Sequence, residues 1–228
     1  MEQKTILIVR GGGDLASGVI HRLYCCGYRV LVLECHKPSA IRRKVSFGEA
    51  VFDGTSAVEG VTGRLISDIA DAEKIWEAKE IPILVDETGE TAKKLKPAAL
   101  IDAILAKKNL GTNRDMASLT VALGPGFEAG KDVDFVIETQ RGHNLGRVIR
   151  KGSATPNTGI PGVIAGYGKE RVIHSPAAGI MHNLSQIGDI VEKDQILARV
   201  DDVPVYASLT GVLRGIIRDG YKVPKGMK

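Results

Sequence analysis

The chain has 228 residues, of which 43% are hydrophobic and 25% charged, a composition typical of soluble folded proteins and unlike disordered or collagen-like ones. The formal net charge is only +4 and aromatic residues make up 4%, which argues against nucleic acid as a partner. No apolar run is long enough to span a bilayer, so we expect a cytoplasmic protein with no membrane partner.

The first half of the sequence alternates β-branched runs with stretches of helical periodicity. Residues 14–27 and 67–80 carry apolar side chains at helical spacing. Most of the β-branched runs lack polar alternation, which is typical of parallel strands buried on both faces. The pattern predicts an α/β fold, with a Rossmann-like parallel sheet in a domain over residues 1–152. The runs expected to form its strands are residues 6–10, 30–34, 81–85, 118–124 and 135–138.

The strongest chemical motif is RGGGDLASG, which follows the first predicted strand and opens the first predicted helix. Gly11, Gly13 and Ala16 match the G-x-G-x-x-A pattern, with Gly12 between the first two. Bare backbone at such a turn lets a pyrophosphate approach the amides at the helix N-terminus. Glu34 ends the second predicted strand, where a carboxylate accepts hydrogen bonds from ribose hydroxyls and repels a 2′-phosphate. The motif predicts NAD or an adenine nucleotide as ligand.

Asp14 opens alternatives to that prediction. At the start of the helix its carboxylate would act as an N-cap and compete with a phosphate for the first-turn amides. Either Asp14 turns away and orders the loop, or the site takes a cationic or metal-chelated ligand, or the glycines serve packing only. No clear general base accompanies the motif. Asp86 and Glu138 end strands, where they could perform acid–base chemistry or cap turns.

Two basic segments are candidates for gripping an anion. Arg42 and Arg43 follow the second predicted strand, where they form either a solvated face or a bidentate phosphate clamp. In ETQRGHNLGRVIR, an extended backbone would place Arg141, His143 and Arg147 on one side as an anion site. The alternative to ligand contact by His143 is a purely structural role.

The three cysteines, Cys25, Cys26 and Cys35, form a poor disulfide framework and fit a reducing compartment. With His21 and His36 nearby, they make a reactive thiol pair or a soft-metal site one alternative. Adjacent cysteines are not a recognised metal-ligand spacing, so we expect buried structural residues and no metal site.

The sequence changes texture after residue 152. Residues 153–169 are rich in Gly, Pro, Thr and Asn, which predicts a linker, followed by a second domain over 170–228. A single offset, from residue 179 to residue 211, aligns two copies of one β-motif in this domain. Neither copy can bury its own face, so we expect the two to intertwine around one core. The aligned pairs are Gly179 with Gly211, Gly188 with Gly220, Val191 with Val223 and Lys193 with Lys225.

This second domain resembles the barrel-sandwich hybrid of biotinyl and lipoyl carrier domains. The resemblance implies a modified lysine at the hairpin between the halves, near residues 199–205. There is no lysine from Gln195 to Tyr221, so a swinging-arm function is excluded and a docking or lid role is expected. The sequence stops at PKGMK where the second motif needs a closing strand, so we expect a truncated C-terminus or an unpaired edge.

Five motifs, RGGGDLASG, NLGT, LGPGF, ETQRGHNLGRVI and PNTGIPG, occur in this order before the carrier-like domain. Together they resemble accessory proteins of the selenium-dependent molybdenum hydroxylase system, which are related in role to xanthine dehydrogenase accessory factors. The resemblance implies a maturation protein that acts on a molybdopterin-type cofactor for a hydroxylase partner. It maps the glycine motif onto Gly11, Gly12, Gly13 and Asp14.

We therefore expect an accessory factor that binds a phosphorylated cofactor, either molybdopterin-type or an adenine nucleotide. Its expected partners are the hydroxylase or its maturation machinery, with homo-oligomerisation as a further option. Whether it catalyses a reaction stays open. An NAD-dependent oxidoreductase, based on Gly11, Gly13 and Glu34, is one alternative, and a non-catalytic docking module for the hydroxylase is the other.

Overall fold

The structure is a computed structural model that describes residues 5–159 and 161–228. Ile160, which belongs to the PNTGIPG motif and to the predicted linker, lies outside the described residues. The chain divides into two compact units, the first comprising Met1–Ala40 and Lys44–Asn157 and the second Ile41–Arg43 and Thr158–Lys228. Among the described helices, none has the length and apolar character that a membrane crossing requires.

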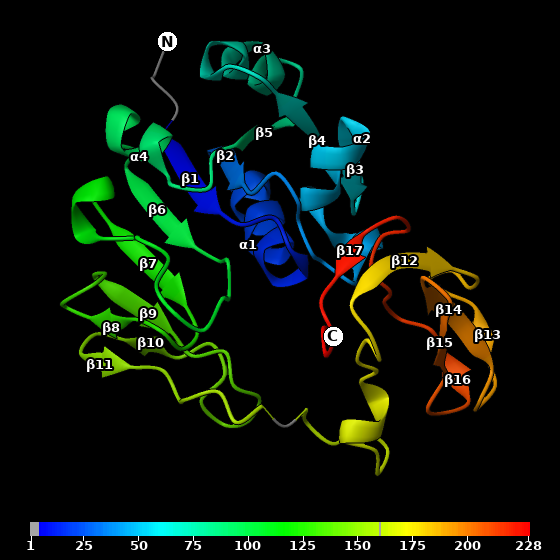
Figure 1. Cartoon of the computed structure of the whole chain (residues 1–228). Helices are drawn as coiled ribbons and strands as arrows, with labels where there is room; N and C mark the ends of the chain where they lie inside the picture. Colours follow the sequence, from blue (N-terminus) through cyan, green and yellow to red (C-terminus); the bar gives the residue numbers. More distant parts are fainter. Residues whose placement is uncertain (1–4, 160) are drawn as a thin grey trace. The chain divides into compact units, whose positions relative to one another are not determined.

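The first unit is built on a mostly parallel sheet, which confirms the α/β class (Figure 1). Nine strands of the described residues run in the order β10-β9-β7-β6-β1-β2-β5-β4-β3. Only the edge pairs, β3 with β4 and β9 with β10, are antiparallel. The strands are β1 Ile6–Arg10, β2 Arg29–Glu34, β3 Thr55–Val58, β4 Val61–Ile66, β5 Ile81–Val85, β6 Ala99–Asp102, β7 Thr120–Leu123, β9 Phe135–Ile137 and β10 Val148–Ile149.

Both faces of this sheet are buried in apolar clusters. Successive strand residues point to opposite faces, so Leu7 and Val9 of β1 join one core cluster and Ile8 joins another. The first cluster includes Ala16 and Ile20 of helix α1 (Asp14–Cys25) and residues of the short α2 (Ala50–Asp53). The second contains residues of α3 (Ala72–Glu77) and α4 (Glu90–Leu95). This two-sided burial explains why the strands lack polar alternation.

The described residues also contain five single-turn 3₁₀ helices and, in the first unit, one small satellite sheet. The satellite sheet pairs β8 (Glu128–Ala129) with β11 (Gly152–Ser153) and packs around Phe127 and Val136. The 3₁₀ helices are η1 Arg43–Val45, η2 Phe47–Glu49, η3 Ile69–Asp71, η4 Arg114–Met116 and η5 Lys169–Arg171.

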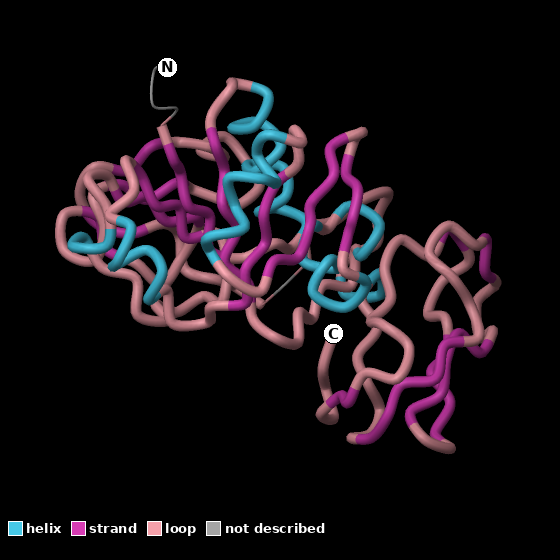
Figure 2. The backbone as a smooth tube through the Cα atoms, turned by 90° about the horizontal axis from the view of Figure 1, so that it is seen from above, coloured by secondary structure: helices cyan, strands magenta, loops and turns pink. Residues whose placement is uncertain are grey.

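The second unit consists mainly of strands and loops (Figure 2). One antiparallel sheet has the order β15-β14-β12-β17, and β13 pairs with β16 in a second. Met181, Val200, Val205 and Val223 are among the residues that form its core. The strands are β12 Gly179–Asn183, β13 Ile190–Val191, β14 Ile196–Val200, β15 Val203–Tyr206, β16 Gly211–Val212 and β17 Lys222–Val223.

The two repeats of the second unit exchange strands. Gly179, from the first repeat, pairs with Val223 of the second, and Gly211 of the second pairs with Val191 of the first. Each pair becomes the other when its first-repeat residue is moved forward, and its second-repeat residue back, by the repeat offset. The predicted intertwining of the two motifs is therefore confirmed.

Backbone hydrogen bonds extend this exchange beyond the strands. Gly188 N donates to Leu213 O at 2.9 Å, and the equivalent Gly220 N donates to Met181 O at 2.7 Å. Each repeat thus supplies the partners that the other repeat's turn needs. The same relation links Asp194 N donating to Ala207 O and Gly226 N donating to Ser175 O, both at 2.8 Å.

The hairpin between β14 and β15 closes on a two-residue turn, Asp201–Asp202. Asp201 has a positive φ of 49° and exchanges hydrogen bonds with Ile180, accepting from its N–H at 3.0 Å and donating to its carbonyl at 2.9 Å. This turn therefore carries two carboxylates, and Asp201 is tied to β12.

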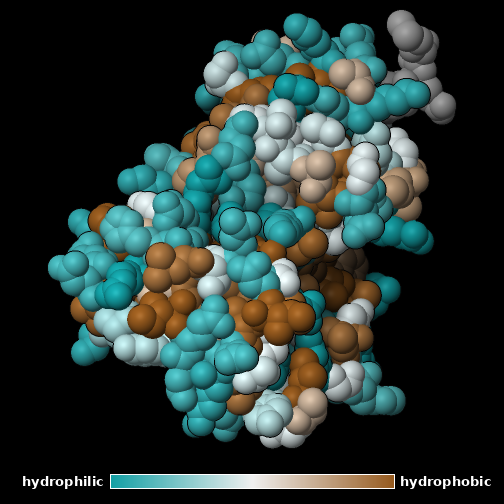
Figure 3. Space-filling model, turned by 90° about the vertical axis from the view of Figure 1, so that its right-hand side faces the viewer, coloured by the Kyte–Doolittle hydropathy of each residue, from teal (hydrophilic) through white to brown (hydrophobic). Residues whose placement is uncertain are grey.

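Hydrophobic side chains are exposed on the face of the molecule shown in Figure 3. Within the second unit, Ile190 and Val212 lie opposite each other in the β13–β16 pair and are 79% and 59% exposed. The equivalent positions in the β12–β17 pair are Ile180 and Lys222. The two pseudo-equivalent ladders thus differ in the surface they present.

Candidate functional site

The centre of the sheet contains a topological switch point. The chain passes from β1 to β2 on one side and later adds β6 on the other side of β1. In parallel α/β sheets, ligands bind outside the carboxyl ends of the strands at such a point. Here the carboxyl end of β1 continues into Gly11, Gly12 and Gly13, so the predicted motif lies where a ligand crevice is expected.

The three glycines have different surroundings. A Cβ on Gly11, whose φ is +95°, would lie 3.0 Å from Ile104 Cα, and one on Gly12 would lie 2.8 Å from Gly48 N. Backbone packing therefore requires both glycines. A Cβ on Gly13 would have no atom within 4 Å, so this position faces open space.

Glu34 is brought directly onto the glycine loop. Its Oε2 accepts from Gly12 N at 2.6 Å and its Oε1 accepts from Cys35 N at 2.7 Å. The Gly12 carbonyl in turn accepts from Ser17 Oγ at 3.1 Å and from Ser46 Oγ at 2.7 Å. Spacing alone predicted that Glu34 faces a ribose, and it gave no indication that this carboxylate holds the loop itself.

Helix α1 begins differently from the prediction for Asp14. The N-cap is Gly13, with φ −66° and ψ −179°, and it makes no side-chain capping bond. Asp14 is the first helical residue, so Gly13 takes the N-cap position that the sequence offered to Asp14. There its charge interacts favourably with the positive end of the helix dipole. Ala16 lies in the core under the loop, fully buried, where its small side chain lets α1 pack on the sheet.

A buried polar network lies beneath the loop. Arg10, only 1% exposed, donates from Nη1 to Thr112 Oγ1 at 2.5 Å and from Nη2 to the Glu87 carbonyl at 2.6 Å. Thr112 donates to Asp102 Oδ2 at 2.6 Å, and Arg10 lies 3.8 Å from that oxygen. Burial raises the pKa of Asp102, outweighing the opposing effects of Thr112 and Arg10. The network joins the ends of β1 and β6 to two loops, and sequence analysis missed it because its members are far apart in the chain.

The strand-end carboxylates act as turn caps. Asp86 accepts from Gly89 N at 2.8 Å and from Thr91 N at 2.7 Å. Glu138 accepts from Thr155 N at 2.8 Å and from its hydroxyl at 2.7 Å. Burial alone would raise the pKa of each carboxyl, but these hydrogen bonds lower it below its ordinary value. A lowered pKa does not suit proton transfer near neutral pH, which favours the capping role over acid–base chemistry.

The cysteines differ from the prediction of burial. Cys25 and Cys26 are exposed, because the last turn of α1 reaches the surface there. The thiol of Cys25 lies 3.8 Å from both ring nitrogens of His21. Burial, together with the charges of Glu34 and Glu87, raises the pKa of the half-buried Cys35 to about 11. Among the described residues, no three His, Cys, Asp or Glu side chains are grouped so that they could hold a metal ion.

The two predicted arginine groups lie in different units of the structure. Arg42 and Arg43 belong to the second unit, where Arg43 Nε donates to the Ile216 carbonyl at 3.0 Å. Arg141, His143 and Arg147 follow β9, which is separated from β1 by β6 and β7. Three strand spacings amount to about 14 Å.

The expected extended backbone over Arg141, His143 and Arg147 is wrong. The segment forms two consecutive turns, with Leu145 N donating to Gly142 O at 3.2 Å and Arg147 N donating to Asn144 O at 2.9 Å. All three side chains are exposed, and the turns remove the two-residue alternation that would have aligned them.

The LGPGF loop follows β7 at the same edge of the sheet. Gly126 has a φ of +109°, and a Cβ there would lie 2.6 Å from Lys108 N. This glycine therefore allows two loops to touch backbone to backbone.

Comparison with known proteins leaves the function open. No family model matches the chain. It is 50% identical over 223 residues to a protein described as "Uncharacterized protein YqeB" from Escherichia coli (strain K12), a match that covers 98% of the chain. The chain spans 41% of the length of that relative. A solved structure of an aspartoacylase family protein from Mesorhizobium loti matches at 10% identity and covers 100% of this chain and 84% of that chain. The TM-score is 0.29, which is too low to indicate a shared fold.

Proposed function

We propose that this chain is an accessory protein that binds a phosphorylated cofactor at the loop between β1 and α1. The proposed ligand is a molybdopterin-type cofactor or an adenine nucleotide, and the proposed role is maturation of a selenium-dependent molybdenum hydroxylase. The order of the sequence motifs supports the role. The observation that carries the binding site is Gly13, which has no atom within 4 Å of a Cβ position at the start of α1.

The residues present fit a phosphate group at this place. The 12-residue helix α1 directs first-turn amides and the positive end of its dipole toward the space at Gly13. On the other side of the loop, Glu34 holds the Gly12 amide. The loop is therefore held in position before a ligand binds, which lowers the entropic cost of binding. In this proposal the sheet is Rossmann-like, with the phosphate outside the carboxyl end of β1.

The second unit would serve as the docking element of this accessory protein. The reciprocal pairing of its two repeats supports a barrel-sandwich arrangement like that of carrier domains. Its hairpin tip, Asp201–Asp202, offers no amine to modify. Recognition of a hydroxylase is consistent with such a module, whereas covalent cargo transport is not.

The binding site is tested by titrating the full chain with ADP and with NAD in a calorimeter, comparing Gly13→Val with Gly18→Val. The same change at Gly18 places a side chain on an exposed position of α1 with no atom within 4 Å of its Cβ. We expect at least a roughly ten-fold loss of ADP affinity for Gly13→Val only, because the branched side chain occupies the phosphate position. Equal affinity of the two variants would contradict the proposal.

A further inference from the structure

A cavity of about 440 Å³ lies in the first unit beside the edge strand β10. Strand β10 and the residues next to it on both sides supply most of its wall. The size lies in the range of small-molecule sites, roughly 300–1,000 Å³. Its lining residues are Glu138, Asn144, Arg147, Val148, Ile149, Arg150, Lys151 and Ser153.

Three cations and one carboxylate line this cavity, so its lining carries a net positive charge. Among the residues that the structure describes, Arg147, Arg150 and Lys151 form no ion pair. Several other arginines of this unit are paired, as Arg29 is with Glu73 and Arg64 with Glu80. The cavity therefore concentrates positive charge that an anion would neutralise.

The one carboxylate in the lining, Glu138, is already engaged by hydrogen bonds. Its Oε1 accepts from Gln140 N at 2.8 Å, and its Oε2 accepts from the amide and hydroxyl of Thr155. The side chain is buried and its pKa is lowered by these bonds, although burial acts in the opposite direction. Glu138 thus holds the hairpin loop in place and leaves the three cations available to a ligand.

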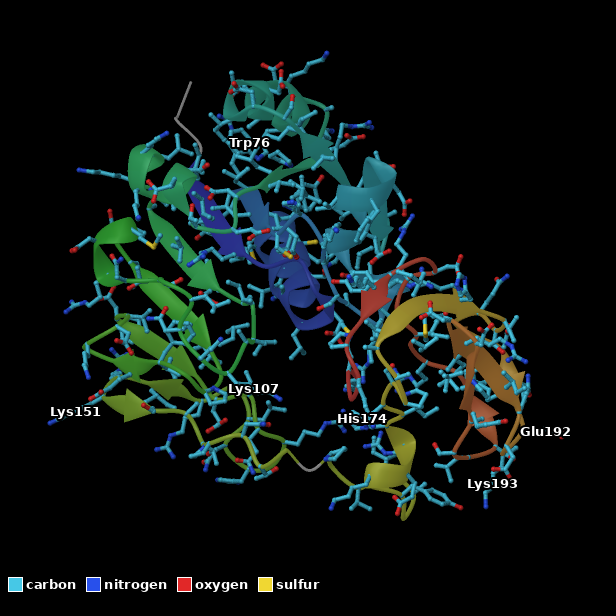
Figure 4. All side chains as sticks on the ribbon, viewed as in Figure 1. Trp76, Lys107, Lys151, His174, Glu192 and Lys193 are labelled. Atoms are coloured by element: carbon cyan, nitrogen blue, oxygen red, sulfur yellow. The ribbon has the colours of Figure 1, made fainter. Side chains whose placement is uncertain are left out.

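Neighbouring groups also orient the two guanidinium groups. Arg150 lies over the ring of Phe135, with 5.1 Å between its Cζ and the ring centroid, and Arg147 Nη1 donates to Asn144 Oδ1 at 3.4 Å. A guanidinium that is positioned in advance loses less freedom when it forms a two-pronged bond to a phosphate. Lys151 is a third cation of the lining, and in Figure 4 its side chain extends outward from the segment between β10 and β11.

We propose that this cavity binds a small organic phosphate of mononucleotide size, with Arg147 and Arg150 on the phosphate. Val148 and Ile149 add apolar surface for the organic part, which favours an organic phosphate over the inorganic ion. The site is distinct from the glycine loop, because three strand spacings, about 14 Å, separate the two places on the sheet edge. It therefore stands independently of the proposed function.

The test is a calorimetric titration with AMP, carried out on the full chain and on the Arg147→Gln/Arg150→Gln double variant. The matched control is Lys131→Gln, which removes an exposed cation from the turn before β9. We expect AMP to bind with at least roughly ten-fold lower affinity in the double variant and unchanged affinity in the control. Inorganic phosphate should bind more weakly than AMP, and added salt should weaken both.

Gly13→Val separates this site from the glycine loop. AMP binding that persists in Gly13→Val and is lost in the double variant supports the cavity. The proposal is overturned if AMP does not bind at all, if the double variant binds as tightly as wild type, or if Gly13→Val alone abolishes binding. Binding of inorganic phosphate as tight as that of AMP would also overturn it.

Discussion

Replacing Thr112 by Val tests the buried network under the glycine loop. The substitution keeps the shape of the side chain but removes the hydroxyl, which accepts from Arg10 at 2.5 Å and donates to Asp102 at 2.6 Å. Each lost bond involves a charged partner, and such bonds contribute about 1.5–3 kcal/mol. Arg10 still lies 3.8 Å from Asp102, so direct attraction recovers part of the loss. We expect the free energy of unfolding to fall by about 3 kcal/mol.

The measurement is guanidinium unfolding followed by tryptophan fluorescence. Trp76 is the only tryptophan of the chain; it lies in α3 of the first unit, is labelled in Figure 4 and donates its indole N–H to Val30 O at 2.9 Å. Its emission therefore reports on the unit that contains the network. The matched control is Thr55→Val on the exposed edge strand β3, which should change stability by less than about 0.5 kcal/mol. A loss below about 1 kcal/mol for Thr112→Val would refute the argument that this hydroxyl links two buried charges.

Three further predictions concern other parts of the first unit. Gly126→Ala places a Cβ against the neighbouring loop at φ +109°, so we expect it to lower the unfolding free energy by at least about 1 kcal/mol in the same assay; an unchanged midpoint would show that the loop can move. Burial raises the pKa of Cys35 to about 11, so mass spectrometry should show it alkylated by iodoacetamide far more slowly than the exposed Cys25, and equal rates would contradict this. The lowered pKa of Glu138 means that its contribution to stability is present above its ordinary pKa of 4.5 and is lost as pH falls through the folded-state pKa; unfolding measured across acidic pH should therefore be less pH-dependent in Glu138→Gln than in wild type.

The sequence predicted several strands that are continuous apolar runs, but it missed β6, which is buried throughout, and the interrupted β4. Residues 6–10 and 81–85 match β1 and β5, because burial on both faces leaves an unbroken hydrophobic run. β4 was not predicted because Gly63 and Arg64 interrupt its run of apolar residues. A Cβ on Gly63 would lie 2.8 Å from the side chains of Ile83 and Phe47, so this glycine serves packing within the sheet.

The glycine motif was found from spacing, but its partners were not. A glycine pattern can predict the loop between β1 and α1, because the conformation of a tight turn depends on residues that are adjacent in the sequence. The contacts of Arg10 with Thr112 and with Glu87 join residues far apart in sequence, which no local pattern encodes. For the same reason, sequence alone could not show that Glu34 engages Gly12.

The predictions for the cysteines and the Arg141 segment failed for other reasons. The cysteines were expected to be buried from the general preference of that residue type, whereas α1 ends at Cys25 on the surface. The prediction for the Arg141 segment extended a strand past its true end, because β9 ends at Ile137. Glycines at positions 142 and 146, with φ of +136° and +79°, mark the turns that replaced the expected strand. Element ends depend on turn residues more than on hydrophobic pattern.

The exchange of strands in the second unit has a consequence for its assembly and its ancestry. Each repeat lacks part of its own strand pairing, since the residues opposite Gly179 and Gly211 belong to the other copy. A chain cut at the Asp201–Asp202 turn should yield two fragments that are unstructured apart and complement each other when mixed. A duplicated ancestral segment would likewise have needed a second molecule of itself before the two copies were fused into one gene.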